Sequence, residues 1–234
     1  MAININKLTY LSGFLGSLIL VICCTVPAIP HPIGQEDPFS FLNHFMSELG
    51  CFKSSKLALV YNSGIFIGGF MLSLFMVGLG HHFRTRLGYA AAVCGGFAGF
   101  ACGLLGYFPL NRLVPHLILA YAFFIAWPVS IGLFSLQVLR EPKNTLSRGL
   151  LFLGMVSISL FVLFLAMPFM IGMQRIMEVD LHQFVRPSFI FTALLEWLMC
   201  LSVFIWVMFA SIKLVSRPPV VRPPDLSAQR ERRN

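Results

Sequence analysis

Residues 57–80 read LALVYNSGIFIGGFMLSLFMVGLG and contain no charged side chain. A helix of about 20 apolar residues matches the thickness of the hydrocarbon core of a bilayer. Inside lipid, only helices or closed barrels satisfy every backbone N–H and C=O, and a stretch of this length favours a helix. Five other stretches have the same character: residues 8–29, 87–108, 114–139, 149–171 and 188–212. The sequence therefore predicts an all-α polytopic membrane protein, a bundle of six transmembrane helices.

The composition agrees with an integral membrane protein. Apolar residues make up 57% of the 234 residues, charged residues 11%, and the mean hydropathy is +0.82. A soluble domain carries about 25% charged residues, so the composition excludes a single soluble core. No segment between the spans could bury its own core, so we expect one transmembrane domain, residues 1–214. Residues 215–234 repeat Arg-Pro-Pro from Arg217 and Arg222, which predicts a disordered, basic cytoplasmic tail.

The Lys and Arg residues outside the spans are concentrated on one side of the bilayer. That side holds both termini and the second and fourth loops, with Arg84, Arg140 and Lys213 among its residues. Under the positive-inside rule, this distribution predicts a cell-membrane protein with both termini in the cytoplasm. The net charge of +8 is then a topology signal, which favours membrane lipids and not nucleic acid as partners. The sequence leaves a homo-oligomer open.

The first external loop has the pattern of a short amphipathic helix. Asp37 and Pro38 form a good N-cap and first turn, and Gly50 is a good stop. Apolar residues fall on one side at helical spacing, and polar residues, Asn43 and His44 among them, fall on the other. We expect this helix to lie in the membrane surface without crossing it.

The cysteines and the glycines bear on packing more than on chemistry. The six cysteines show no spacing typical of a zinc site, and we expect no cofactor. A disulfide from Cys51 to Cys23 or Cys24 is sterically conceivable, and the sequence leaves it open. In the third span, small residues recur at four-residue steps and predict a face that a neighbouring helix approaches closely: Ala91, Gly95, Gly99 and Gly103, continued by Gly106.

Glu196 is the one acidic residue within the six predicted spans. It lies eight positions after Ser188, about 12 Å along a helix, which predicts a place near mid-bilayer. An acid there costs about 2.5 kcal/mol or more unless it is paired or neutralised. Thr192 and Cys200 extend a polar stripe through Glu196 that should face the bundle. Two interpretations stay open: an intramembrane site, or a protonated carboxyl that is hydrogen-bonded to a neighbouring helix.

Most other unusual polar residues lie on the external side. If the spans form one bundle, these groups line the mouth of a cavity whose floor is Glu196. The candidate ligand-binding residues are Asn43, His44, Ser47, Glu48, Asn62, Asn111, Arg112, His116, His182, Arg186 and Glu196. No pattern in the sequence identifies catalytic residues.

Short motifs occur in order at the predicted helix ends. They are Ser47-Glu48-Leu49-Gly50, Asn62-Ser63-Gly64 and Gly106-Tyr107-Phe108-Pro109, followed by His116. With these motifs, residues 47–136 resemble an uncharacterised, mainly prokaryotic family of six-span proteins, domain of unknown function 998. Such families often carry an acid at the position of Asn111. More distantly, the layout is similar to the eukaryotic six-span group of autophagy modulators and glycolipid-anchor-remodelling proteins. The resemblance implies the topology and the importance of the external cluster, and it implies no activity.

Three functions remain in competition. The favoured one is non-enzymatic: binding or handling a lipid-like or small amphiphilic ligand in an externally opening polar cavity. The alternative is an intramembrane lipid hydrolase or acyl-transfer enzyme, which would be metal-dependent if His44, His116 and His182 supplied three ligands. A proton-coupled transporter with Glu196 as its titrating carboxyl ranks third, because no internal repeat supports it. The sequence does not decide whether the protein is an enzyme.

Overall fold

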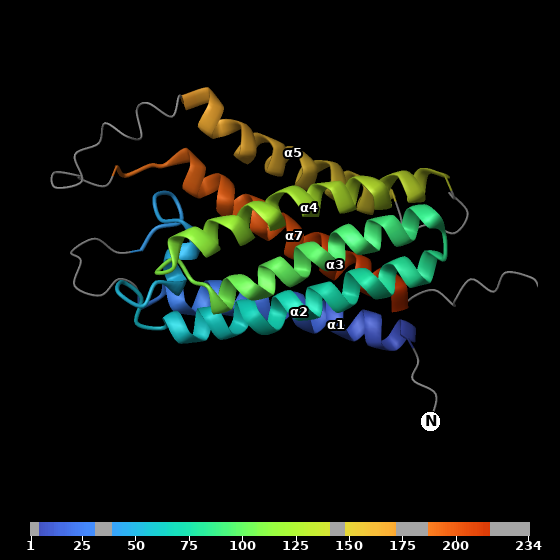
Figure 1. Ribbon diagram of the computed structural model, residues 1–234, viewed down its shortest axis with the longest axis horizontal. Coiled ribbons are helices and arrows are strands. Elements are labelled where there is room, and N and C mark those ends of the chain that lie inside the picture. Colours follow the sequence, from blue (N-terminus) through green and yellow to red (C-terminus); the bar gives the residue numbers. More distant parts are fainter. Residues whose placement is uncertain (1–4, 31–38, 141–147, 172–186, 216–234) are drawn as a thin grey trace, which may run out of the picture.

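Figure 1 shows the computed structural model, which describes residues 5–30, 39–140, 148–171 and 187–215. Six of its helices are long and apolar enough to cross a membrane, which confirms the predicted six-span, all-α fold. They are α1 (Ile5–Thr25), α2 (Ala58–Phe83), α3 (Arg86–Tyr107), α4 (Leu113–Arg140), α5 (Arg148–Ile171) and α7 (Phe191–Val215). Two short 3-10 helices, η1 (Val26–Ala28) and η2 (Met46–Gly50), lie between α1 and α2. The predicted tail from residue 216 lies outside the described residues.

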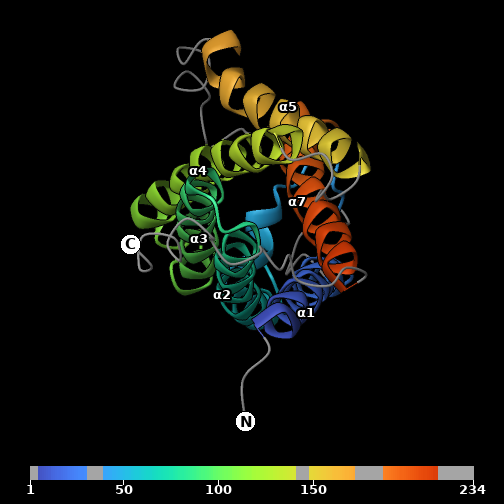
Figure 2. The ribbon, with the colours of Figure 1, turned by 90° about the vertical axis from the view of Figure 1, so that its right-hand side faces the viewer.

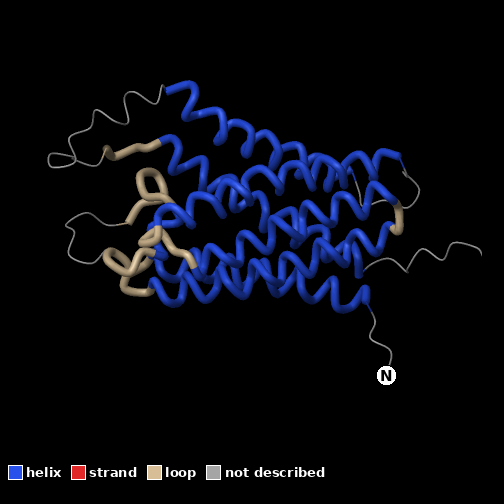
Figure 3. The backbone as a smooth tube through the Cα atoms, in the orientation of Figure 1, coloured by secondary structure: helices blue, strands red, loops and turns tan. Residues whose placement is uncertain are grey.

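The six long helices form a ring in chain order (Figure 2). Each helix packs against the next along the chain, and α7 packs against α1 and closes the ring. Consecutive helices run in opposite directions, so alternate connections lie at the same end of the bundle (Figure 3). The end that carries η2 is the external one under the predicted topology.

Large side chains fill the centre of the ring toward the opposite end. Trp127 and Trp206 are fully buried, and their ring centroids lie 6.1 Å apart in an edge-to-face arrangement. Phe134 packs on Trp206 with a centroid distance of 6.4 Å, and Phe83 packs on Phe134. Because this half of the bundle is filled by aromatic rings, the internal cavities described below lie in the external half.

Helices α2 and α3 approach so closely that their backbones meet at glycines. A Cβ on Gly99 would collide with the backbone of Ser73, and a Cβ on Gly106 would collide with the backbone of Asn62. The Ser73 hydroxyl donates a hydrogen bond to the Gly96 carbonyl across the same interface, at 2.8 Å. The close approach expected from the small-residue face of the third span is therefore confirmed.

The first external loop differs from the predicted amphipathic helix. Residues 41–44 form turns, and only residues 46–50 form a helix, the five-residue η2. Phe45 is extended (φ −69°, ψ 147°), and its N–H donates to Glu48 Oε1 at 2.9 Å. Met46 is buried inside the ring, and its N–H donates to Glu196. The expectation of one helix lying in the membrane surface is wrong, because a hydrogen bond to α7 draws the segment into the bundle. Asp37 and Pro38 lie outside the described residues.

The cysteines are all described, and all are free. The disulfide that the sequence left open, from Cys51 to Cys23 or Cys24, is not formed. Cys24 instead lies with its Sγ 3.5 Å from Met46 Sδ, beneath η2. The thiols of α1 therefore act as small apolar packing groups under the loop.

Candidate ligand-binding site

Glu196 connects the last helix to the first external loop. Its side chain is buried, and Oε2 accepts a hydrogen bond from the Met46 N–H at 2.7 Å. Glu196 comes five positions after Phe191, where α7 begins, or about 7.5 Å along the helix. It therefore lies nearer the external end than the predicted mid-bilayer position. The expectation that it faces the bundle is met, and its partner is a loop backbone that descends to reach it.

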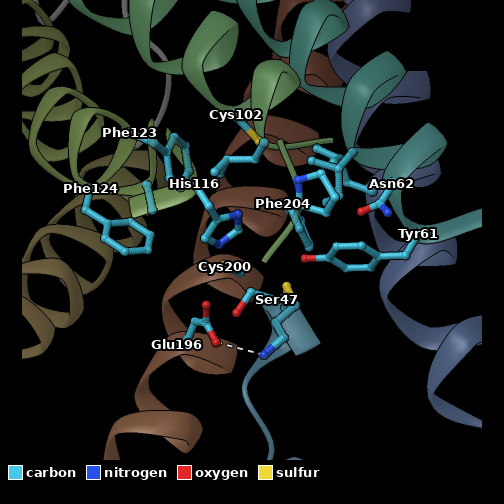
Figure 4. Close-up of a pocket in the computed structure, with 16 residues that line it drawn as sticks. Ser47, Tyr61, Asn62, Cys102, His116, Phe123, Phe124, Glu196, Cys200 and Phe204 are labelled. Atoms are coloured by element: carbon cyan, nitrogen blue, oxygen red, sulfur yellow. Dashed lines mark hydrogen bonds between the residues drawn. The ribbon is translucent and has the colours of Figure 1, made fainter. Parts of the chain in front are cut away.

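A small cavity of about 60 Å³ lies in the ring beside Glu196 (Figure 4). Its polar lining comes from η2 and from four of the long helices: Ser47, Tyr61, Asn62, Cys102, His116, Glu196 and Cys200. The imidazole of His116, the hydroxyl of Tyr61 and the carboxylate of Glu196 point toward the same space in Figure 4. A water needs about 10–15 Å³ by this kind of measure, so the cavity holds a few waters or one small polar group.

A larger cavity of about 490 Å³ adjoins the first, toward α4 and α5. Ser47, His116 and Glu196 line both cavities, and Glu48 adds a second carboxylate to the larger one. The remainder of its wall is mostly apolar and aromatic: Phe45, Leu110, Leu117, Ala120, Tyr121, Phe124 and Phe164, with Cys51 and Ser54. The larger cavity is thus polar where it meets η2 and apolar where it meets α4 and α5.

The orientation of His116 follows from its partner. Nδ1 lies 2.9 Å from the Phe108 carbonyl oxygen, which can only accept, so Nδ1 carries the proton and donates. In the neutral ring, Nε2 is then a hydrogen-bond acceptor. The carbonyl of Phe108 is free to accept because the helix α3 ends at Tyr107, immediately before it.

Asn62 lies at the opposite wall of the small cavity. It is 4% exposed, and its Nδ2 donates to the Gly50 carbonyl at 2.9 Å, which ties α2 to the end of η2. Its Oδ1 has no hydrogen-bond partner among the described residues. Of the sequence candidates, five therefore line the cavities: Ser47, Glu48, Asn62, His116 and Glu196.

Four other candidates take structural positions around the mouth. Asn43 Nδ2 donates to the Pro187 carbonyl at 3.0 Å, and His44, which is 1% exposed, lies against Phe39. The Trp197 indole N–H donates to the His44 carbonyl at 2.9 Å. These contacts fasten the loop to the start of α7 without placing either side chain in the cavities.

Asn111 and Arg112 hold the outside of the second external turn. Asn111 Oδ1 accepts from the Phe52 N–H at 2.9 Å. The Arg112 guanidinium lies 5.9 Å from the ring centroid of Tyr107 and 5.8 Å from that of Phe108. Both residues are exposed and line neither cavity. His182 and Arg186 lie outside the described residues.

The histidines do not form the three-ligand set that a metal-dependent enzyme would need. His116 lines the cavities and His44 is packed under the loop, while His182 is not described. Among the described residues, no group of three His, Cys, Asp or Glu side chains is placed to hold a metal ion.

Tyr61 and Cys102 line the small cavity although the sequence argument did not select them. Tyr61 precedes Asn62, and a tyrosine beside a buried amide in the first turns of a membrane helix was a usable signal. Cys102 carried none, because a cysteine in a span usually behaves as a small apolar residue.

Comparison with known protein families settles the kinship of the chain. A family model described as protein of unknown function, DUF998, matches residues 15–213. The chain belongs to the DUF998 family. The resemblance drawn from the motifs near Ser47, Asn62 and Phe108 is thereby confirmed, and so is a multi-pass membrane protein. No curated protein and no solved structure matches the chain. The more distant similarity to autophagy modulators stays a prediction.

Proposed function

We propose that this DUF998 protein binds a lipid-like amphiphile, with the polar group of the ligand beside Ser47, His116 and Glu196. The alkyl chain would lie between α4 and α5. The observation that carries this proposal is the larger cavity, which is polar at one end, apolar at the other, and about 490 Å³ in volume. Small-molecule sites commonly have volumes of about 300–1,000 Å³ and a few polar groups in an apolar wall.

The larger cavity reaches the outer surface of the bundle on the α4 side. Leu117 and Tyr121 line it and are 43% and 47% exposed. Phe164 is the contribution of α5, which diverges from α4 toward the external end in Figure 1. Since this surface faces acyl chains in a bilayer, a ligand could enter sideways from the outer leaflet.

The polar end of the cavity would provide the selectivity. Moving an alkyl chain from lipid into an apolar cavity gains little, because lipid tails are as apolar as the helix side chains. A preference for one amphiphile over bulk lipid must then come from hydrogen bonds and charge. Ser47, Glu48, His116 and Glu196 supply these where η2 meets the cavity.

The two alternative functions have less support. A hydrolase needs a nucleophile paired with a base, and no hydrogen bond joins Ser47 to His116 among the described residues. A transporter needs a route to the other side, and Trp127, Trp206 and Phe134 fill the bundle there in the described conformation. A binding role requires neither feature.

Photo-crosslinking with a fatty alcohol that carries a diazirine in its chain and a terminal alkyne tests this proposal. In phosphatidylcholine nanodiscs, we expect labelling of Leu117, Tyr121 and Phe164 above that of other lipid-facing residues. Ala120→Trp should reduce it at least fivefold, because Ala120 lines both cavities and an indole there would fill the space.

Ile118→Trp is the matched control. Ile118 lies on the same helix and is 65% exposed, so this tryptophan would face lipid and leave the cavity open. Labelling spread evenly over the lipid-facing helices, or labelling that is unchanged by Ala120→Trp in a folded protein, would overturn the proposal.

A further inference from the structure

The two cavities expose negative charge without a compensating cation. Glu48 and Glu196 both line the larger cavity, and no Lys or Arg is among the described residues that line either one. Arg112 is external but is turned outward onto the rings of Tyr107 and Phe108. Carboxylates removed from water are costly unless a positive charge or hydrogen-bond donors approach them.

The hydrogen-bond donors in the cavity walls are already used by the protein. The Met46 N–H donates to Glu196, Asn62 Nδ2 donates to the Gly50 carbonyl, and His116 Nδ1 donates to the Phe108 carbonyl. What these groups leave for a ligand is mainly acceptors. A carboxylate has about four lone-pair sites, so Glu196 can accept further hydrogen bonds, as can His116 Nε2.

Asn62 provides an independent sign of a missing donor. Its side chain is 96% buried, and Oδ1 has no partner among the described residues. In Figure 4, this oxygen lies on the side of Asn62 that faces the small cavity. Buried polar atoms are nearly always hydrogen-bonded, so an unpaired amide oxygen beside a cavity indicates a donor that enters it.

We infer that the head group of the ligand is an ammonium, seated in the small cavity between Glu196 and Asn62. This inference rests on the proposed amphiphile site and names its ligand class: a long-chain amine or a lipid with a free amino group. An ammonium combines positive charge with three N–H donors, which match a carboxylate and an unpaired amide oxygen. The 60 Å³ of space admits so small a group. A phosphate or carboxylate head would instead face two glutamates and meet no cation.

A series of compounds with the same dodecyl chain tests the inference: dodecylamine, dodecyltrimethylammonium, dodecanol and dodecyl phosphate. Each competes with the photoreactive alcohol for labelling of Tyr121 in neutral phosphatidylcholine nanodiscs, at equal mole fraction in the bilayer. We expect dodecylamine to compete at least tenfold better than dodecanol or dodecyl phosphate. Dodecyltrimethylammonium should be about fivefold weaker than dodecylamine, because it is charged but has no N–H for Asn62.

Three variants locate the effect. Glu196→Gln keeps an acceptor for the Met46 N–H and should reduce the preference for dodecylamine over dodecanol at least fivefold, and Glu48→Gln should reduce it less. Ser211→Ala is the folded control, because Ser211 is buried in α7 and lines neither cavity. If Glu196→Gln does not fold, the ranking of the four compounds on the unaltered protein still decides.

The outcomes separate the two proposals. If the photoreactive alcohol labels the cavity and all four compounds compete equally, or if dodecyl phosphate competes best, the ammonium inference is wrong and the amphiphile site stands. If the alcohol labels no cavity residue, the proposed function itself fails. A preference for dodecylamine that survives in both glutamine variants would also overturn the inference.

Discussion

Replacing Glu196 by leucine should release the first external loop from the bundle. The carboxylate is the acceptor for the buried Met46 N–H, at 2.7 Å. A buried N–H left without a partner costs about 1–3 kcal/mol. Taking about 2 kcal/mol, and a factor of ten for each 1.4 kcal/mol, the loop should open about 30-fold more often.

Hydrogen exchange measured by mass spectrometry on a peptide that covers residues 41–52 is the direct assay. For Glu196→Leu, we expect the Met46 amide to exchange about 30-fold faster than in the unaltered protein. Glu196→Gln keeps an oxygen in the same place and should change the rate less than fivefold. Equal exchange in the leucine and glutamine variants would refute the idea that this hydrogen bond anchors η2.

Three further predictions concern packing, the loop and topology. Gly99→Ala should destabilise the protein by about 1–3 kcal/mol in unfolding by SDS, because the new Cβ collides with the backbone of α2. Gly132→Ala is its control, since the nearest atom to a Cβ there is 4.0 Å away, and a loss as large as that of Gly99→Ala would contradict this account. Trp197→Phe removes the donor to the His44 carbonyl and should cost about 1 kcal/mol, seen as faster exchange of residues 40–44, whereas unchanged exchange would argue against that bond. Green fluorescent protein fused after Asn234 should fluoresce and alkaline phosphatase fused there should be inactive, and the reverse pattern would place this terminus outside.

Features that depend on neighbouring residues along the chain were predictable. Each span is a continuous apolar run whose length alone matches the bilayer, so the helix ends came within a few residues of those observed. The small-residue face of α3 was also readable, because Gly99 and Gly103 repeat at helical spacing and lipid rewards close backbone approach.

Features that depend on distant residues were not. Residues 39–50 have the spacing of an amphipathic helix, yet Phe45 is extended because Glu48 and Glu196 accept the N–H groups of Phe45 and Met46. A tertiary hydrogen bond of this kind leaves no trace in local spacing. The same limit applied to the site, where proximity in sequence placed Asn43 and His44 with Ser47, although they fasten the loop outside the cavities.

The hydrogen bond between Met46 and Glu196 also sets an order of biosynthesis. The two residues are 150 positions apart, and ribosomes add about 5–20 residues per second, so Met46 waits about 10–30 s for its acceptor. Until α7 inserts, α1 lacks the neighbour that closes the ring, and η2 has nothing to descend toward. A nascent chain that stops after α5 would thus hold five inserted helices around an unfinished vestibule. The last span to leave the ribosome completes the first loop that the ribosome made.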